Sequence, residues 1–243
     1  MRVIFFLILL CFSVASLTAQ NNSGPASDAE KAFVRKLEQR IAPILVTAGK
    51  SMPGQWMIHI NTNNEDQGAI NIAQHKGRPH EFRCSLSMEY MATKTESAAL
   101  QKEMVDHNKS MSKAAIIDGS RLNDPSLKYS IEVSIVINPY QFTPVNVQQY
   151  AAPGGATTEP GTALTLFRTK ELGPGAPYYA LYIGDYNLSN KNGKQVLEEN
   201  FGTSTDCCNA RTMVIEVHSS QTVANAFIGK LNLPALNRII KEL

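Results

Sequence analysis

The chain has 243 residues, of which 43% are hydrophobic and 18% are charged, and its formal net charge at pH 7 is +2. This composition is typical of a globular protein and excludes a wholly disordered chain. The 23 basic residues are scattered among 21 acidic residues, so the clustered basic excess typical of nucleic-acid-binding proteins is missing.

The first residues predict a secretory signal peptide at 1–19. Arg2 is the only charged residue before Asp28, and an unbroken apolar run from 3 to 12 is followed by small residues. Charged, apolar and small-residue segments in this order are the signature of an export signal. The apolar run is too short to span about 30 Å of hydrocarbon as a helix.

Cleavage after Ala15 or after Ala19 fits the small-residue rule, and we prefer Ala19. Residues 20–26 then predict a flexible mature N-terminus, because they are polar and include a Gly-Pro pair. We expect a secreted or periplasmic protein with no transmembrane segment in the mature chain.

Helices are predicted near both ends of the chain and in its first half. Ser27 and Glu30 form a capping box that opens one helix, and Thr93 and Glu96 form a second box that opens another. Pro43 is expected to end or kink the first helix. Apolar residues at helical spacing after 222 and after 234 predict the closing helical segments.

Strands are recognised by alternating apolar and polar residues, and the clearest run is 128–138. There Ile131, Val133, Ile135 and Ile137 share one face, which is the period of a half-buried strand rich in β-branched side chains. Six strands are expected in all: 55–61, 81–90, 128–138, 163–170, 178–186 and 211–219.

The segment 139–161 interrupts this pattern, because it is rich in proline and glycine, and we expect a long surface loop there. An interdomain linker is the alternative. The element order leaves few βαβ crossovers, so the sheet is predicted to be mostly antiparallel. The expected fold is a single α+β domain at 27–243, with one sheet of about six strands and three helices packed on it.

Three cysteines follow the predicted signal peptide, which indicates one bridge and one spare thiol, or no bridge. A disulfide from Cys84 to Cys207 or Cys208 would close a loop of more than 120 residues, stabilising the fold by roughly 4–5 kcal/mol in the chain-entropy model. A bridge between the adjacent Cys207 and Cys208 is the second choice, because it would strain the intervening peptide.

Two histidines and a cysteine near the middle of the first half could suggest a metal site. His75, His80 and Cys84 are close in sequence, and imidazole and thiolate are zinc ligands that His59, His218 or another cysteine could complete. Their spacing matches no zinc motif, however, and Cys84 alternates with apolar residues that are expected to face inward. We therefore expect no metal ligands and no cofactor.

Catalytic motifs are equally weak. Asp206, Glu216 and His218 could assemble a nucleophile, base and orienting group with one of the serines, but no Gly-x-Ser-x-Gly elbow is present. Glu216 and His218 are two residues apart and share one face of a predicted strand, which favours a solvated polar face. His218 is the best candidate for a catalytic residue.

Three tyrosines attract more attention. Tyr178, Tyr182 and Tyr186 share one face of a predicted strand, with Ala180 and Gly184 between them on the same face. Tyrosine presents a large apolar body with a polar tip, so such a face could bind a ligand. The structural alternative is that the rings pack under a helix or across strands.

Taken together, these features favour non-catalytic binding of a small molecule or of an envelope or extracellular partner. A secreted hydrolase with a dispersed site that includes His218 is one alternative. A structural or assembly protein of the cell envelope is the other.

Overall fold

The computed structural model describes most of the chain from residue 27 onward. The described ranges are 27–62, 81–111, 125–139, 145–149, 167–169, 179–200 and 208–243. The predicted signal peptide, the segment 20–26 and much of the predicted loop at 139–161 lie outside these ranges.

Four α-helices and one 3-10 helix lie within the described residues: α2 Asp28–Lys50, α3 Lys94–Met111, η2 Pro125–Lys128, α4 Gln221–Ile228 and α5 Leu233–Glu242. Both predicted capping boxes are confirmed. The amide of Glu30 donates to Ser27 Oγ at 3.3 Å, and the amide of Glu96 donates to Thr93 Oγ1 at 3.3 Å. In each box the glutamate also accepts a bond from the backbone amide of its cap residue.

The helix α2 continues through Pro43 to Lys50, so the expectation that it could end at the proline was wrong. A proline inside a helix removes one backbone hydrogen bond and crowds the preceding turn. Here the same helix buries Leu37, Ile41 and Leu45 on both sides of the proline. Packing of this continuous apolar stripe outweighs the local cost.

Nine strands lie within the described residues, in place of about six: β1 Trp56–Thr62, β2 Phe82–Tyr90, β3 Ser130–Ile137, β4 Val145–Gln149, β5 Phe167–Thr169, β6 Tyr179–Gly184, β7 Tyr186–Lys191, β8 Lys194–Glu199 and β9 Thr212–His218. Their order is β1-β2-β3-β9-β6-β5-β4-β8-β7. Every neighbouring pair is antiparallel. The predicted α+β class and antiparallel pairing are confirmed.

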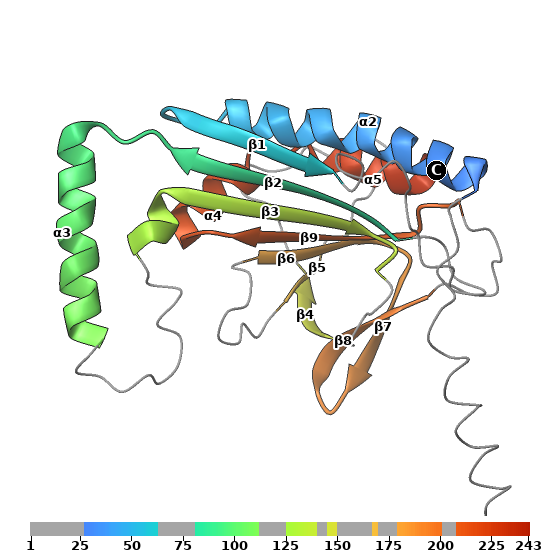
Figure 1. Ribbon diagram of the computed structural model, residues 1–243. Helices are drawn as coiled ribbons and strands as arrows, with labels where there is room; N and C mark the ends of the chain where they lie inside the picture. The colour runs from blue at the N-terminus through green and yellow to red at the C-terminus, as the bar shows by residue number, and fades with distance from the viewer. Residues whose placement is uncertain are drawn as a thin grey trace, which may run out of the picture.

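The helices α2, α4 and α5 cover one face of the strands β1, β2, β3, β9 and β6 (Figure 1). Ile131, Val133, Ile135 and Ile137 of β3 all point to this side and are buried. We call this cluster the main core. The register predicted from their alternation is confirmed. The helix α3 does not join this layer, and it stands at one end of the molecule beside η2 (Figure 1).

The second half of the chain departs from prediction. The expected strand 178–186 is divided at Gly184, whose φ of 115° ends β6, and Asp185 separates it from β7. The strands β7 and β8 form a hairpin whose turn is Asn192-Gly193, with φ values of 54° and 76°. An Asn-Gly pair is a strong hairpin signal, because both positions accept positive φ.

The segment predicted as a loop at 139–161 includes the strand β4, so that prediction was wrong at Val145–Gln149. This strand has only five residues, and it pairs with β5, the next strand in the chain, and with β8, which comes later. On the face opposite the helices, a second apolar cluster forms from these strands and their neighbours: Val147, Ala180, Tyr182, Leu197 and Val214.

Candidate functional site

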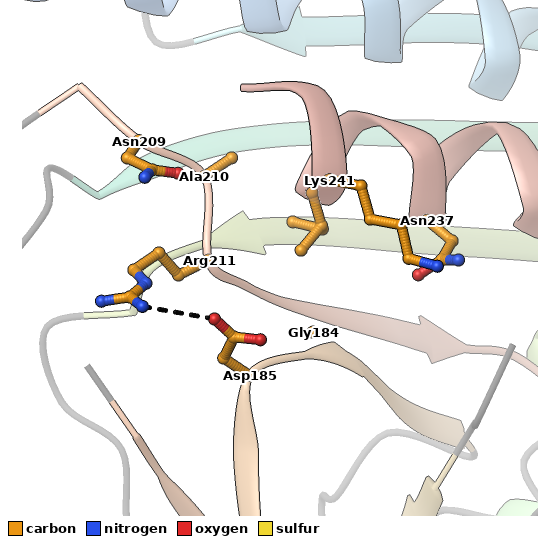
Figure 2. A pocket seen from close by; sticks show the side chains of 8 residues that line it. Gly184, Asp185, Asn209, Ala210, Arg211, Asn237 and Lys241 are labelled. Atoms are coloured by element: carbon orange, nitrogen blue, oxygen red, sulfur yellow. Dashed lines mark ion pairs between the residues drawn. The ribbon is translucent and has the colours of Figure 1, made fainter. Parts of the chain in front are cut away.

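A cavity of about 450 Å³ lies at the end of the sheet where β6 stops and β9 begins. The turn after β6, the segment that enters β9 and the last turns of α5 surround it (Figure 2). The residues that line it are Gly184, Asp185, Asn209, Ala210, Arg211, Asn237, Ile240 and Lys241. Small-molecule sites are commonly about 300–1,000 Å³, so this volume suits a compact ligand.

One wall of the cavity is held by Asn138, which lies at the end of β3 and is 1% exposed. Its side chain donates to the carbonyl of Asn209 at 2.8 Å and accepts from the amides of Arg211 at 2.9 Å and Thr212 at 3.3 Å. Its own amide donates to the carbonyl of Thr212 at 2.9 Å. One buried side chain therefore sets the path of the chain from 209 to 212.

A second wall depends on Gly184. A Cβ placed on this glycine would lie 2.1 Å from the carbonyl oxygen of Arg211, and its φ of 115° is itself unfavourable for other residues. The close approach lets the amide of Asp185 donate to the same carbonyl at 2.8 Å. The side chains of Arg211 and Asp185 form an ion pair at 3.5 Å (Figure 2).

The third wall is one face of α5, where Asn237 and Lys241 lie one turn apart and project toward the cavity (Figure 2). Asn237 is only 8% exposed, and its side-chain amide has no hydrogen-bond partner among the described residues. Glu242 points to α2 instead, where it accepts a bond from Arg40 at 2.6 Å. Its carboxylate therefore does not neutralise Lys241.

These groups can bind a polar molecule. Among the described lining residues, two cationic side chains, one carboxylate and two side-chain amides converge on the cavity, and Arg211, Lys241 and Asp185 together carry a formal charge of +1. None of the eight lining residues is a serine, threonine, cysteine or histidine. The described lining residues offer charged groups and hydrogen-bonding amides to a molecule in the cavity.

His218, the predicted catalytic candidate, lies at the opposite end of β9 from this cavity. Its register partner on β3 is Glu132. The residues from Arg211 to His218 span about 23 Å in an extended strand, so the imidazole is remote from the cavity. Its ring makes no hydrogen bond or ion pair within the part of the chain that the structure describes. A catalytic role for His218 stays a prediction.

The tyrosines are divided between two strands. Tyr182 lies on β6 and is buried in the second cluster, and Tyr186 begins β7, with ring centroids 5.9 Å apart in an edge-to-face contact. The hydroxyl of Tyr186 donates to the carbonyl of Met213 at 3.3 Å, and burial raises its pKa well above the ordinary value. This pair packs across strands, while Tyr178 lies outside the described residues.

The predicted disulfide from Cys84 to Cys207 or Cys208 is not formed. Cys84 is a free, buried thiol in the main core, and burial with the nearby charge of Glu38 raises its pKa to about 12. Cys84 shares a strand face with buried apolar residues because it belongs to the main core, and this pattern does not indicate a disulfide. Cys207 lies outside the described residues.

The metal candidates are not brought together by the described part of the structure. His75 and His80 lie outside its ranges, and the described residues contain no group of three His, Cys, Asp or Glu side chains that could hold a metal ion. His59 lies on β1 and His218 on β9, with two strands between them.

Sequence reasoning missed the residues of the cavity. Asn138 precedes a proline at the end of a strand, and Gly184 interrupts a tyrosine-rich run, which are the only local signals. Nothing in the sequence indicates that Asp185, Arg211 and Asn237 lie together, because they come from separate segments of the chain.

Comparisons with protein-family models, with curated proteins and with solved structures found no match to this chain. None of the helices in the described ranges combines the length and apolar character that crossing a membrane requires. The geometry of the cavity is therefore the basis on which a function can be proposed.

Proposed function

We propose that this protein binds a small polar molecule, without transforming it, in the cavity between α5 and the turn after β6. The observation that carries the proposal is the side-chain amide of Asn237. This amide makes no hydrogen bond to a described residue, and its polar atoms are not fully buried, so a molecule that enters the cavity can reach them. Asn237 is only 8% exposed, and it lines a polar cavity large enough for a ligand that could supply the bond.

The framework of the cavity supports this role. Asn138 and Gly184 hold the backbone of two walls through short contacts, so the polar groups are already positioned before a ligand arrives. Preorganised sites lose less entropy on binding than flexible ones. The charged groups of the described lining residues, which are one carboxylate, one guanidinium and one ammonium, can hold a polar molecule by ion pairs and hydrogen bonds.

Replacing Asn237 with leucine tests the proposal, because leucine has a similar size and no hydrogen-bonding group. We expect Asn237→Leu to keep the unfolding free energy within about 1 kcal/mol of the parent value, because the amide makes no hydrogen bond to a described residue and is not fully buried. The same variant should lose the thermal shift that a library of small polar compounds produces with the parent protein. Differential scanning fluorimetry and chemical denaturation measure both effects.

The exposed Asn190 on β7 provides the matched control. Asn190→Leu should leave both ligand response and stability nearly unchanged. If Asn237→Leu destabilised the protein and kept every ligand response, Asn237 would have a structural role and the proposed function would be wrong.

We further propose that binding takes place outside the cytoplasm, as the apolar run at 3–12 predicts. The intact mass of the protein recovered from an exporting host would identify a mature N-terminus after Ala15 or Ala19. A full-length mass in the cytosol would contradict export.

A further inference from the structure

We infer that the ligand of the cavity is a small acidic amino or hydroxy acid, meaning a dicarboxylate that also carries an amino or hydroxyl donor. This inference rests on the proposed function, and it names the chemical class that the charges and hydrogen-bonding groups of the same cavity would recognise. Each part of the ligand corresponds to a group on a different wall.

The first carboxylate is assigned to Arg211. Its position is set from two sides, by the bond from its amide to Asn138 Oδ1 at 2.9 Å and by the ion pair with Asp185 at 3.5 Å. A guanidinium carries five donors in a planar fork that matches a carboxylate. Because the five donors of a guanidinium point in several directions, Arg211 can hold Asp185 and a ligand carboxylate at the same time.

The second carboxylate is assigned to Lys241. This ammonium makes no ion pair with a described residue, since the neighbouring Glu242 pairs with Arg40 at 2.6 Å. Lys241 also lies in the last turn of α5, where the helix dipole favours a cation, and this is its alternative, purely structural role. The matched lysine for that role is Lys50, which lies in the last turn of α2 and is absent from the cavity lining.

The donor group is assigned to Asp185. A simple inorganic anion would meet Asp185 as a like charge, whereas an ammonium or hydroxyl on the ligand would donate to its carboxylate. The amides of Asn209 and Asn237 complete the lining and can accept and donate. The formal charge of +1 on the described lining residues complements the net charge of −1 of a dicarboxylic amino acid.

Size agrees with this class. A water molecule occupies about 30 Å³ in the liquid, so the cavity of about 450 Å³ holds a molecule of modest size together with a few waters. Long chains and polymers would extend beyond the three walls that carry the polar groups.

A matched series of five-carbon compounds, with one inorganic anion, tests the inference by isothermal titration calorimetry on the full chain. The probes are L-glutamate, 2-hydroxyglutarate, glutarate without the donor, glutaramide without the charges, and inorganic phosphate. We expect L-glutamate or 2-hydroxyglutarate to bind at least about tenfold more tightly than glutarate, since tenfold corresponds to one modest hydrogen bond. Glutaramide and phosphate should bind weakly or not at all.

Three variants connect the binding to the cavity. Lys241→Met should weaken binding of the preferred probe about tenfold, and Arg211→Gln should weaken it about tenfold to a hundredfold. Lys50→Met should leave binding unchanged. Because Arg211 also contributes to folding, its variant is judged only beside a thermal melt, while the exposed Lys241 provides the test that does not depend on stability.

The outcomes separate this inference from the proposed function. Equal binding of glutaramide and L-glutamate, lost in Asn237→Leu, would overturn the acidic class and leave a small-molecule site. Equal binding of phosphate and L-glutamate would reveal general anion attraction and also overturn the inference. Failure of all five probes would overturn it too, and the broader compound library with Asn237→Leu would then decide the proposed function alone.

Discussion

The two faces of the same strands differ sharply in what they do. On the helix-covered face, the inward residues of β3 are Ile131, Val133, Ile135 and Ile137, and each is at most 1% exposed. On the opposite face, the same strand presents Glu132 to solvent, and β2 presents Ser85 and Ser87. The stabilisation from burying apolar side chains is therefore concentrated on the helix-covered face. The other face changes in polarity from strand to strand.

The opposite face is also apolar at Val136 on β3, and it becomes more so toward β6, where the second cluster forms around Tyr182 and Leu197. Within the described residues, this cluster contains five buried side chains, whereas the main core draws buried residues from three helices and four strands, with β1 packed against it. The candidate cavity borders the main core at Ala210 and Ile240, and none of its described lining residues belongs to the second cluster. Substitutions on the two faces should therefore differ greatly in how much they lower the unfolding free energy.

The largest effect is expected from Ile135→Asp, which places a charge in the main core beside residues that cannot pair with it. An unpaired buried charge is among the most destabilising changes known. We expect loss of the cooperative unfolding transition, measured by circular dichroism during thermal denaturation.

The control is Ser85→Asp on the other face of the neighbouring strand β2. Ser85 is exposed, so this variant should unfold within about 1 kcal/mol of the parent. A normal transition for Ile135→Asp would mean that the register of β3 is wrong.

The next effect compares one leucine from each apolar region. Leu86 on β2 belongs to the main core and Leu197 on β8 to the second cluster, and both are at most 1% exposed. Truncation of a buried leucine to alanine costs about 2–5 kcal/mol, with larger losses where neighbours cannot relax. We expect Leu86→Ala to cost at least about 1 kcal/mol more than Leu197→Ala in chemical denaturation. Equal losses would show that the second cluster is packed as firmly as the main core.

A smaller effect is expected at Asn138, which joins the end of β3 to the start of β9. Its φ of 48° suits glycine, so Asn138→Gly keeps the backbone conformation while it removes the side-chain hydrogen bonds to Asn209, Arg211 and Thr212. We expect a loss of about 2 kcal/mol in unfolding free energy and weaker ligand binding. A variant as stable as the parent would contradict the positioning role assigned to Asn138.

The smallest effect at neutral pH concerns Cys84, because its thiol is uncharged in both folded and unfolded states there. Its pKa is raised from the ordinary 9.0 to about 12 by burial and by Glu38. Its contribution to stability is therefore complete below about pH 9 and is lost as the pH rises toward about 12. Cys84→Ala should show a shallower decrease in stability than the parent over this range, measured by chemical denaturation at a series of pH values.

Thiol labelling provides the complementary measurement, in a background where the other three cysteines are serine. Cys84 should react with a disulfide reagent at about pH 8 only as fast as the protein unfolds, since thiolate is the reactive form. Rapid labelling under native conditions would show that this part of the main core is accessible.

Local pattern was enough to predict much of the first half of the molecule. The alternation along β2 and β3 identifies their buried faces, because side chains alternate across a strand with a period of two. Ser27 with Glu30, and Thr93 with Glu96, mark helix starts because a capping box needs only residues three positions apart. These patterns lie within one helical turn or one strand, so they can be recognised without knowing which element packs against them.

Other features depended on contacts between distant segments. The helix α2 passes Pro43 because its packing on the sheet outweighs a local rule, and β4 exists because β5 and β8 pair with it. The break at Gly184 is imposed by the carbonyl oxygen of Arg211, which lies 2.1 Å from the position that a Cβ on this glycine would occupy. No pattern within the tyrosine-rich run contains that carbonyl.

By itself, the sequence determined which side chains face the main core, since periodic burial is written into each strand and helix. Only the tertiary structure decided where the candidate site lies. Asn138 bonds to residues 71 to 74 positions later in the chain, and Asn237 comes to the same cavity from the final helix. Such a site has no local sequence pattern, because its polar groups come from distant parts of the chain and meet only when the chain folds.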